Sequence, residues 1–172
     1  MISTAATIRE LIDSAAPARQ VAPNIAGLSE LIPTLLDRRQ DTRVRLGGNL
    51  FDVVVSGGGA EGRIVATVLD EAQGRCGPVI HDPDRGWLYW LVPPGSSRLW
   101  APHTHGVCIG APHTITVPPL DQVQPPGPHW LRPCAGNRLV PTPALRELLS
   151  HLRPEPSPHT ALVAHRRRNS TP

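Results

Sequence analysis

The sequence predicts a small α+β protein with a mostly antiparallel sheet and flanking helices. Its 172 residues are enough for one domain with a core of its own. Short runs rich in β-branched and aromatic residues are separated by Gly, Pro and Asn, which is typical of hairpins. Consecutive strands are therefore expected to pair antiparallel, an order that a doubly wound parallel sheet does not have.

The composition divides the chain into three segments. Residues 1–28 are expected to form a short helix and a linker, because Ile8, Leu11 and Ile12 share one helical face and prolines follow. Residues 29–152 are expected to form the domain. Residues 153–172 are rich in Pro and Arg and lack apolar periodicity, so we expect a disordered tail there.

The domain is expected to contain hairpins and three helices. Gly47-Gly48-Asn49 predicts a tight turn between the first two strands, because Gly and Asn tolerate positive φ. Thr142 and Pro143 stand in the N-cap and N1 order that begins a helix. The predicted elements are, in order, a helix over 29–40, strands over 44–46 and 50–55, a helix over 63–72, strands over 78–81 and 87–92, strands over 115–117 and 129–131, and a helix over 142–152.

The charge permits nucleic-acid binding without requiring it. All 17 basic residues are arginine, and the net charge is +3. Cys76, Cys108 and Cys134 are odd in number and form no C-x-x-C pair, which indicates neither a disulfide framework nor a zinc ribbon. No signal segment and no membrane-spanning apolar run is recognisable, so we expect a soluble, cytoplasmic protein without membrane contact.

A glycine-rich segment lies between a predicted strand and a predicted helix. Gly57 to Gly62 satisfies the G-x-G-x-x-G pattern, and Asp82 follows about twenty residues later, which is the layout of a dinucleotide-binding fingerprint. The alternative is a strand-to-helix turn with no ligand. The hairpin expected over residues 78–92 favours the turn, because the fingerprint requires parallel strands with a crossover helix.

Histidines are concentrated in one loop. His103, His105, Cys108 and His113 lie within eleven residues and offer imidazole and thiolate ligands for a zinc ion. Their spacing follows no established zinc pattern, so a loop of solvated histidines is the competing interpretation. His129, beside Trp130, is expected to pack on an edge strand.

Asp52 is a carboxylate inside the most β-prone run of the chain. Burying it without a partner would cost several kcal/mol. We therefore expect Asp52 to face a rim, a partner or a metal ion, or to accept N–H groups of the Gly-rich turn that follows.

The order of these segments resembles a known family. The segments that carry the resemblance occur in a fixed order: Val44 to Gly48, Phe51-Asp52-Val53, a helix, Gly77-Pro78-Val79, Gly86 to Val92, and Cys108-Ile109-Gly110 before Ile115 to Pro119. The order is similar to that of the N-terminal domain of bifunctional DNA primase/polymerases in the archaeo-eukaryotic primase superfamily. The resemblance is to a small actinobacterial form and covers residues 29–152.

The resemblance implies an RRM-like sheet whose acids hold two divalent metals, Mg²⁺ or Mn²⁺, for nucleotidyl transfer. The family's first acid falls on Asp52, but its second falls on Val54. The family's strand histidine, which contacts the nucleotide, falls on Trp87, and its third acid falls on His105. Mg²⁺ prefers oxygen ligands, so a single carboxylate with an imidazole is a poor replacement.

Three hypotheses follow. The first is a reduced, non-catalytic primase/polymerase-like protein that retains a groove for nucleotides or DNA, lined by Asp52, Trp87, Tyr89 and His105. The second is an active metal-dependent primase/polymerase with atypical ligands. The third is a scaffold reused to bind a protein partner, because fold does not fix function.

Overall fold

The computed structural model describes residues 39–47, 50–74, 77–134 and 138–152. The short helix and linker expected over residues 1–28 and the tail expected over 153–172 lie outside these ranges, and the helix expected over 29–40 lies almost wholly outside them. The described elements are β1 (Thr42–Arg45), β2 (Asp52–Gly57), α3 (Ala60–Gln73), β3 (Val79–Asp82), β4 (Trp87–Val92), α4 (Ser96–Leu99), β5 (Gly106–Ile109), β6 (Thr114–Val117), β7 (His129–Arg132) and α5 (Thr142–Ser150).

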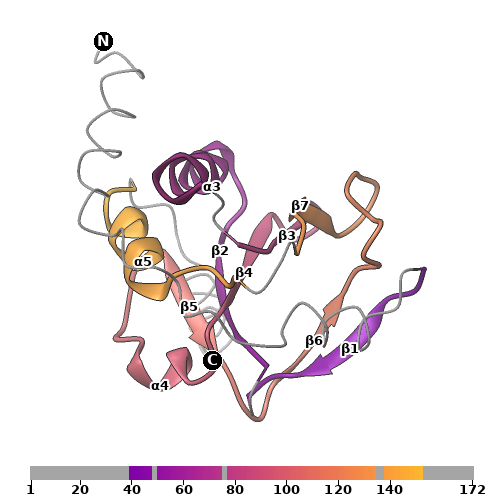
Figure 1. Ribbon diagram of the computed structural model, residues 1–172, viewed down its shortest axis with the longest axis horizontal. Coiled ribbons are helices and arrows are strands. Elements are labelled where there is room, and N and C mark those ends of the chain that lie inside the picture. The colour runs from indigo at the N-terminus through magenta and orange to yellow at the C-terminus, as the bar shows by residue number, and fades with distance from the viewer. Residues whose placement is uncertain (1–38, 48–49, 75–76, 135–137, 153–172) are drawn as a thin grey trace, which may run out of the picture.

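The predicted α+β class with a mostly antiparallel sheet and flanking helices is confirmed, and a second, two-stranded sheet is present that was not predicted (Figure 1). The larger sheet has the order β5-β2-β4-β3-β7, and every neighbouring pair in it is antiparallel. Helix α3 joins β2 to β3, and β4 lies between these two strands. The order β5-β2-β4-β3 is that of a split βαβ, or ferredoxin-like, unit, the topology of RRM-like sheets, with β7 added at one edge.

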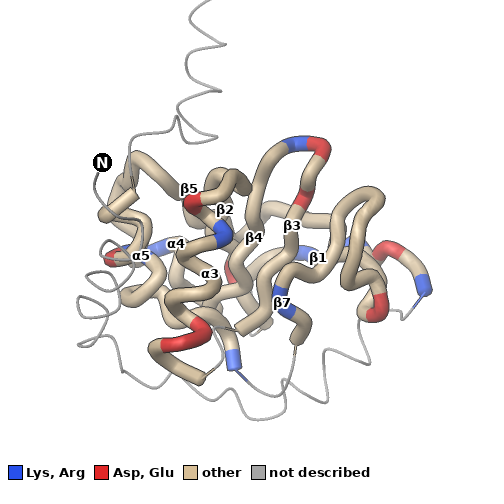
Figure 2. The backbone as a smooth tube through the Cα atoms, turned by 90° about the horizontal axis from the view of Figure 1, so that it is seen from above, with Lys and Arg blue, Asp and Glu red and all other residues tan. Residues whose placement is uncertain are grey.

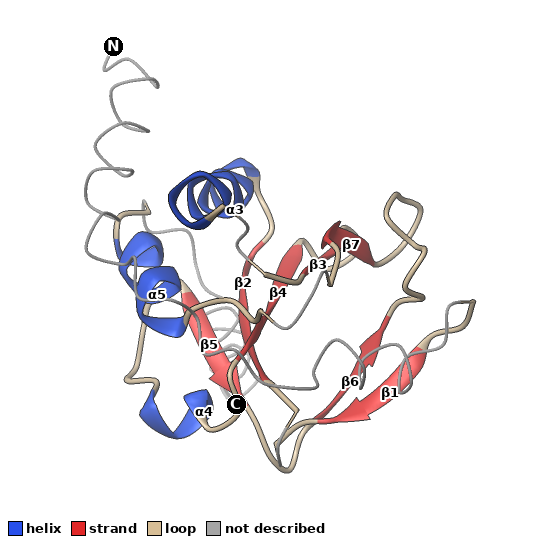
Figure 3. Cartoon of the chain, in the orientation of Figure 1, coloured by secondary structure: helices blue, strands red, loops and turns tan. Residues whose placement is uncertain are grey.

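One face of the larger sheet is covered by α3 and α5 (Figure 3). Helix α3 is amphipathic: Val65, Val68 and Leu69 are buried, and the helix ends at Gly74, which has a left-handed φ of 75°. The helix-side core consists of Val54, Val65, Ala66, Val68, Leu69, Val79, Leu88, Trp90, Val92, Val140, Ala144, Leu145, Leu148 and Leu149. Within it, Trp90 donates its indole N–H to Ser56 Oγ at 2.8 Å.

The other face of the larger sheet packs against the two-stranded sheet of β1 and β6 (Figure 3). Side chains alternate along β2, so Val53 and Val55 belong to this second core while Val54 belongs to the first. The second core consists of Val44, Leu46, Phe51, Val53, Val55, Ile80, Leu91, Ile115, Val117, Trp130 and Leu139. The larger sheet is therefore buried on both faces.

Two sequence predictions are corrected by the topology. The hairpin expected between strands 44–46 and 50–55 is not formed, because β1 pairs antiparallel with β6 and not with β2. At Gly47 the chain passes so close to Ala111 that a side chain would lie 2.6 Å from the Ala111 Cβ, which ties the end of β1 to the turn before β6. Strand β5 was expected to be a loop. The hairpin of β3 and β4 is confirmed.

The Gly-rich segment is a packed strand-to-helix turn. Gly58 donates its N–H to the Gly86 carbonyl at 2.7 Å. A methyl group at Gly62 would overlap the Gly57 carbonyl and contact Leu88. Both neighbours of β2 are antiparallel, so the parallel arrangement that a dinucleotide fingerprint requires is absent from the described sheet. The glycines are explained by close backbone packing.

Among the residues that the structure describes, no helix combines the length and the apolar character needed to cross a bilayer.

Candidate functional site

Asp52 is enclosed on the helix side of the sheet. It is 1% exposed and, by strand alternation, faces the same side as Val54. Its Oδ2 accepts the backbone N–H of Ser97, in α4, at 2.8 Å. A side chain added at Gly110 would lie 2.8 Å from Asp52 Oδ1, so backbone closes the second side of the carboxylate. Asp52 was expected to face a rim, a partner group or a metal ion, or to accept N–H groups of the Gly-rich turn. It has a hydrogen-bond partner within the chain, and that partner is the backbone of α4 and not the Gly-rich turn.

Trp87 and Tyr89 lie on the opposite face, against the second core. Their rings meet edge to face with centroids 6.2 Å apart. Trp87 pairs with Gly57, whereas Val92, at the other end of β4, pairs with Asp52. At about 3.3 Å per residue, Trp87 is roughly 16 Å along the ladder from Asp52 as well as on the other face.

His105 lies at a third place, next to His103, which contacts the end of α5. Its backbone N–H donates to His103 Nδ1 at 3.1 Å, and His103 Nε2 is 3.0 Å from Ser150 Oγ. Burial, together with the charge of Arg146, lowers the pKa of His103. The guanidinium of Arg146 also lies over the Trp100 ring, 5.3 Å from its centroid. These contacts fasten the loop before β5 to α5.

The predicted groove of Asp52, Trp87, Tyr89 and His105 is consequently not assembled as one surface. Asp52 faces the helix layer, the two aromatic residues face β1 and β6, and His105 packs near α5. A strand presents successive residues to opposite faces, and sequence order alone does not reveal which face a given residue takes when both faces are buried.

The predicted metal ligands are brought together only in part, because the rings of His103 and His105 are neighbours, with centroids 5.9 Å apart. His105 precedes β5 and His113 follows it, so a four-residue strand separates them. In the described ranges, no three His, Cys, Asp or Glu side chains, Asp52 included, are placed to hold a metal ion. Burial, with a smaller effect of Asp52, raises the pKa of Cys108 to about 12, which disfavours the thiolate that would bind zinc. The described residues thus offer no support for a metal site, and the metal-site prediction stays a prediction.

A groove of about 540 Å³ lies between the second face of the larger sheet and β6. We call it the β6 groove. It is lined by Asp41, Ile80, Asp82, Arg85, Tyr89, Thr114, Ile115, Thr116, Pro118 and Pro128. Among these, Tyr89 was predicted to line a nucleotide groove, and Asp82 was considered as the acid of a dinucleotide-binding fingerprint. The others come from segments that are distant in sequence, and no local pattern indicates that they meet.

A hydrogen-bonded turn forms one wall of the β6 groove. Asp82 is 1% exposed and accepts the Arg85 backbone N–H at 3.1 Å and Arg85 Nη1 at 2.7 Å. The Tyr89 hydroxyl donates to the same carboxylate at 3.5 Å. Burial, reinforced by Asp82, raises the pKa of Tyr89 to about 12, so this hydroxyl stays protonated at neutral pH. Arg85 thus neutralises Asp82 and holds its own guanidinium at the groove.

Asp41 is the remaining charged residue of the groove. It is exposed, and no described residue forms an ion pair with it. With Asp82 balanced by Arg85, the β6 groove carries one net negative charge. This charge disfavours a phosphate group there and favours a cationic one.

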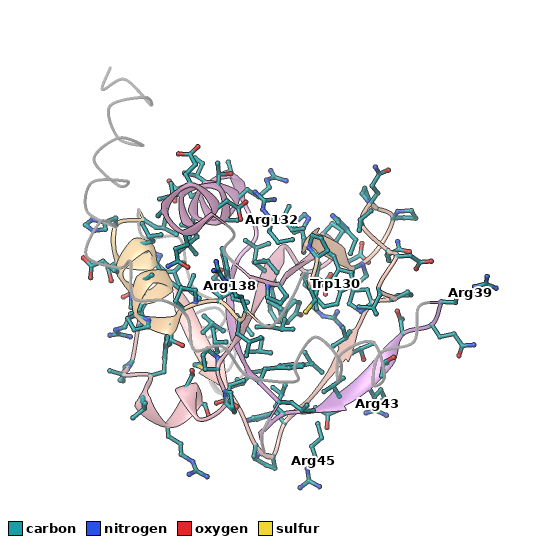
Figure 4. All side chains as sticks on the ribbon, in the orientation of Figure 1. Arg39, Arg43, Arg45, Trp130, Arg132 and Arg138 are labelled. Atoms are coloured by element: carbon teal, nitrogen blue, oxygen red, sulfur yellow. The ribbon has the colours of Figure 1, made fainter. Side chains whose placement is uncertain are left out.

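The outward side of β1 has the opposite character. Arg43 and Arg45 are exposed and alternate with the buried Val44, and Figure 4 shows both side chains projecting away from the body of the protein. Figure 2 shows the basic positions of this strand. Across the ladder, Arg43 is opposite Thr116 and Arg45 is opposite Thr114. We call these four residues the arginine face.

No family model matches the chain, and no curated protein and no solved structure is significantly similar to it. The resemblance to DNA primase/polymerases therefore stays a prediction, and function has to be inferred from the residues themselves.

Proposed function

We propose that this protein is a non-catalytic relative of the DNA primase/polymerases that binds nucleic acid through the arginine face. The proposal combines the resemblance in segment order with two features of the structure. The enclosure of Asp52 speaks against nucleotidyl transfer, and the arginine face provides a surface for phosphate groups.

The environment of Asp52 speaks against catalysis. A two-metal mechanism needs several carboxylate oxygens that are open to metal ions and to the reacting phosphate. Asp52 is enclosed by Ser97 and Gly110, and Val54, where the family has its second acid, is 0% exposed in the helix-side core. Opening this site would require α4 to leave the sheet. The described residues therefore favour binding over nucleotidyl transfer.

The arginine face carries the binding proposal. Arg43 and Arg45 are exposed on a short two-stranded sheet, and the exposed Thr114 and Thr116 stand directly opposite them. Guanidinium and hydroxyl groups are common donors to phosphate oxygens. The sheet face on which an RRM stacks bases is covered here by β1 and β6. We therefore expect contacts to the nucleic-acid backbone, with little dependence on base sequence.

The salt dependence of binding to a labelled single-stranded oligonucleotide tests this proposal. On a single strand, each arginine that neutralises a phosphate contributes about 0.7 to the slope of log affinity against log salt concentration. The double variant Arg43→Gln, Arg45→Gln should therefore make the slope shallower by about 1.4. Arg98→Gln, an exposed arginine on α4, is the matched control for loss of charge and should leave the slope almost unchanged. No binding, or an equal effect of the control, contradicts the proposal.

A polymerase assay tests the loss of catalysis. Primer extension and primer synthesis with Mg²⁺ or Mn²⁺ should give no incorporation above background. Metal-dependent incorporation that disappears in Asp52→Ala would overturn the non-catalytic assignment and favour the hypothesis of an active enzyme with atypical ligands.

A further inference from the structure

The β6 groove runs along an edge of β6. Successive side chains of a strand point to opposite faces, so a groove on one face contacts alternate residues. The β6 groove instead contacts three consecutive residues, Thr114, Ile115 and Thr116, and it contacts no residue of β1 within the ladder. A surface that reaches consecutive residues of one strand lies at its edge, here the edge turned away from β1.

The backbone of that edge offers hydrogen-bonding groups. Leu46 donates its N–H to the His113 carbonyl at 2.8 Å, and the register places Val44 opposite Ile115. In an antiparallel ladder, hydrogen-bonded and non-hydrogen-bonded pairs alternate. Thr114 and Thr116 therefore occupy non-hydrogen-bonded positions, and their N–H and C=O groups point away from β1. In the described part of the chain, no further strand joins β6 at this edge.

We propose that the β6 groove binds an extended peptide segment of a partner protein, which adds as a third strand beside β6. In such strand addition, main-chain hydrogen bonds to Thr114 and Thr116 supply affinity, and alternate side chains enter the groove. The floor offers Ile80 and Ile115 to an apolar side chain.

Charge decides between a peptide and a nucleotide in this groove. Asp41 is its uncompensated charge, so the partner segment carries an Arg or Lys side chain next to an apolar one. A nucleotide would bring phosphate to a groove of net negative charge. Thr114 and Thr116 belong to both proposed surfaces, whereas Arg43 and Arg45 lie outside the β6 groove, so variants of these two arginines distinguish peptide binding from nucleic-acid binding.

Selection of peptides that bind the wild type from a phage-displayed library of random linear peptides tests the proposal. The variant Thr116→Pro serves as the comparison, because peptides that bind by strand addition should bind it more weakly. Proline removes the N–H that points to the free edge but none of the N–H groups that β6 gives to β1, so the variant should keep its fold. Thr114→Pro is the second variant, in case Thr116→Pro unfolds. Circular dichroism and the thermal midpoint establish that each variant is folded.

The expected result is enrichment of peptides in which apolar residues alternate and a basic residue is present. Their affinity should fall roughly tenfold in the folded proline variant, through the lost hydrogen bond and the added ring. Asp41→Asn should lower the affinity for peptides that carry the basic residue. It should not change the affinity for the same peptides in which a neutral residue replaces the basic one. Absence of enrichment, or equal binding to the wild type and the folded proline variant, overturns the proposal.

Amide hydrogen exchange gives a direct readout of the pairing. A selected peptide should slow the exchange of the Thr114 and Thr116 amides, which face the edge, and change Ile115 and Val117 little, because β1 already protects them. The same peptide with alternate amides N-methylated is the matched control and should give no protection. Protection at other strands, with Thr114 and Thr116 unchanged, contradicts strand addition. Peptide affinity of the double variant Arg43→Gln, Arg45→Gln, whose side chains lie outside the β6 groove, should equal that of the wild type, which separates this result from the proposed nucleic-acid function.

Discussion

The carboxylate of Asp52 is held by protein groups in place of water. A buried carboxylate needs hydrogen-bond donors, and the N–H of Ser97 provides one at 2.8 Å. Gly110 lets the backbone approach the other oxygen closely enough that a side chain would overlap Ser97. The position that resembles a catalytic acid thus serves to dock α4 on β2. The same residue type can satisfy the family pattern and have a purely structural role.

The docking role of Asp52 predicts a loss of stability on substitution. Asp52→Ala leaves the partly buried Ser97 N–H without its acceptor, which should lower the free energy of unfolding by about 1–2 kcal/mol. Asp52→Asn keeps an acceptor oxygen and should cost clearly less. Urea denaturation followed by circular dichroism measures both. Equal stability of wild type and Asp52→Ala would show that the contact is energetically unimportant.

Gly62 separates the packing role of the glycine-rich segment from a ligand-binding role. Gly62→Ala should lower the free energy of unfolding by about 1–3 kcal/mol, because the new methyl group meets the Gly57 carbonyl and Leu88. Thr67→Ala, at an exposed position of the same helix, is the control and should change stability by less than about 0.5 kcal/mol. If Gly62→Ala is as stable as the control, close packing does not explain this glycine.

At the scale of single residues, the packing of His129 could be predicted but the β6 groove could not. Tyr89 was expected in a nucleotide groove with Asp52 and His105; it lines the β6 groove without them, and its role in ligand binding stays a prediction. His129 was expected to pack on an edge strand, and it does so against His81 with ring centroids 5.1 Å apart. Nothing in the sequence around Asp41 and Arg85 indicates that they line the β6 groove, because that position depends on the distant strand β6. A charged residue in a polar segment is indistinguishable by sequence from ordinary surface charge.

At the scale of elements, strands with a local signal were predicted and pairings over long distances were not. The β-branched and aromatic runs of β2 and β4 and the turn between β3 and β4 are local features. β5 has only four residues and begins at Gly106, so it resembles the loop around it. β1 pairs with β6, about seventy residues away, because both bury apolar residues on the second core. The tight turn predicted from Gly47-Gly48-Asn49 is a local pattern, and it does not show that β1 pairs with the distant β6 in place of β2.

The contact between β3 and β7 predicts an acid-sensitive stability. Burial lowers the pKa of His81, and the neighbouring His129 and Arg63 lower it further. His81 is therefore neutral in the folded state over a range in which the unfolded chain takes up a proton. Its contribution to stability is present above its unfolded pKa of about 6.5 and is lost as the pH falls through that value.

Thermal denaturation between about pH 7.5 and about pH 5.5 measures this effect. The wild type should lose thermal stability over this interval, and His81→Gln, which cannot be protonated, should lose less. His103 has a lowered pKa as well and should contribute in the same direction. His113→Gln, at an exposed position, is the control and should follow the wild type. An identical pH dependence of His81→Gln and the wild type contradicts the prediction.

At the scale of the whole molecule, one sheet is shared by two cores. Trp90 is 0% exposed in the helix-side core, and Trp130 is 1% exposed in the second core, where its indole N–H donates to the Pro119 carbonyl at 3.0 Å. Val53 and Val54 are neighbours in β2 and belong to different cores. Damage to either core therefore acts on the backbone of the same central strand, and the described domain should unfold as one cooperative unit.

Val54→Ala tests this cooperativity because it removes two methyl groups from the helix-side core alone. It should lower the free energy of unfolding by about 2 kcal/mol, near the low end for large-to-small core substitutions. With fluorinated tryptophan, the resonances of Trp90 and Trp130 should disappear at the same urea concentration, and Val54→Ala should shift both midpoints equally. Val53→Ala should do the same from the other side of the strand. If Val54→Ala moves only the Trp90 transition, the sheet of β1 and β6 with its core is a separate folding unit, and β6 must be able to detach from the larger sheet.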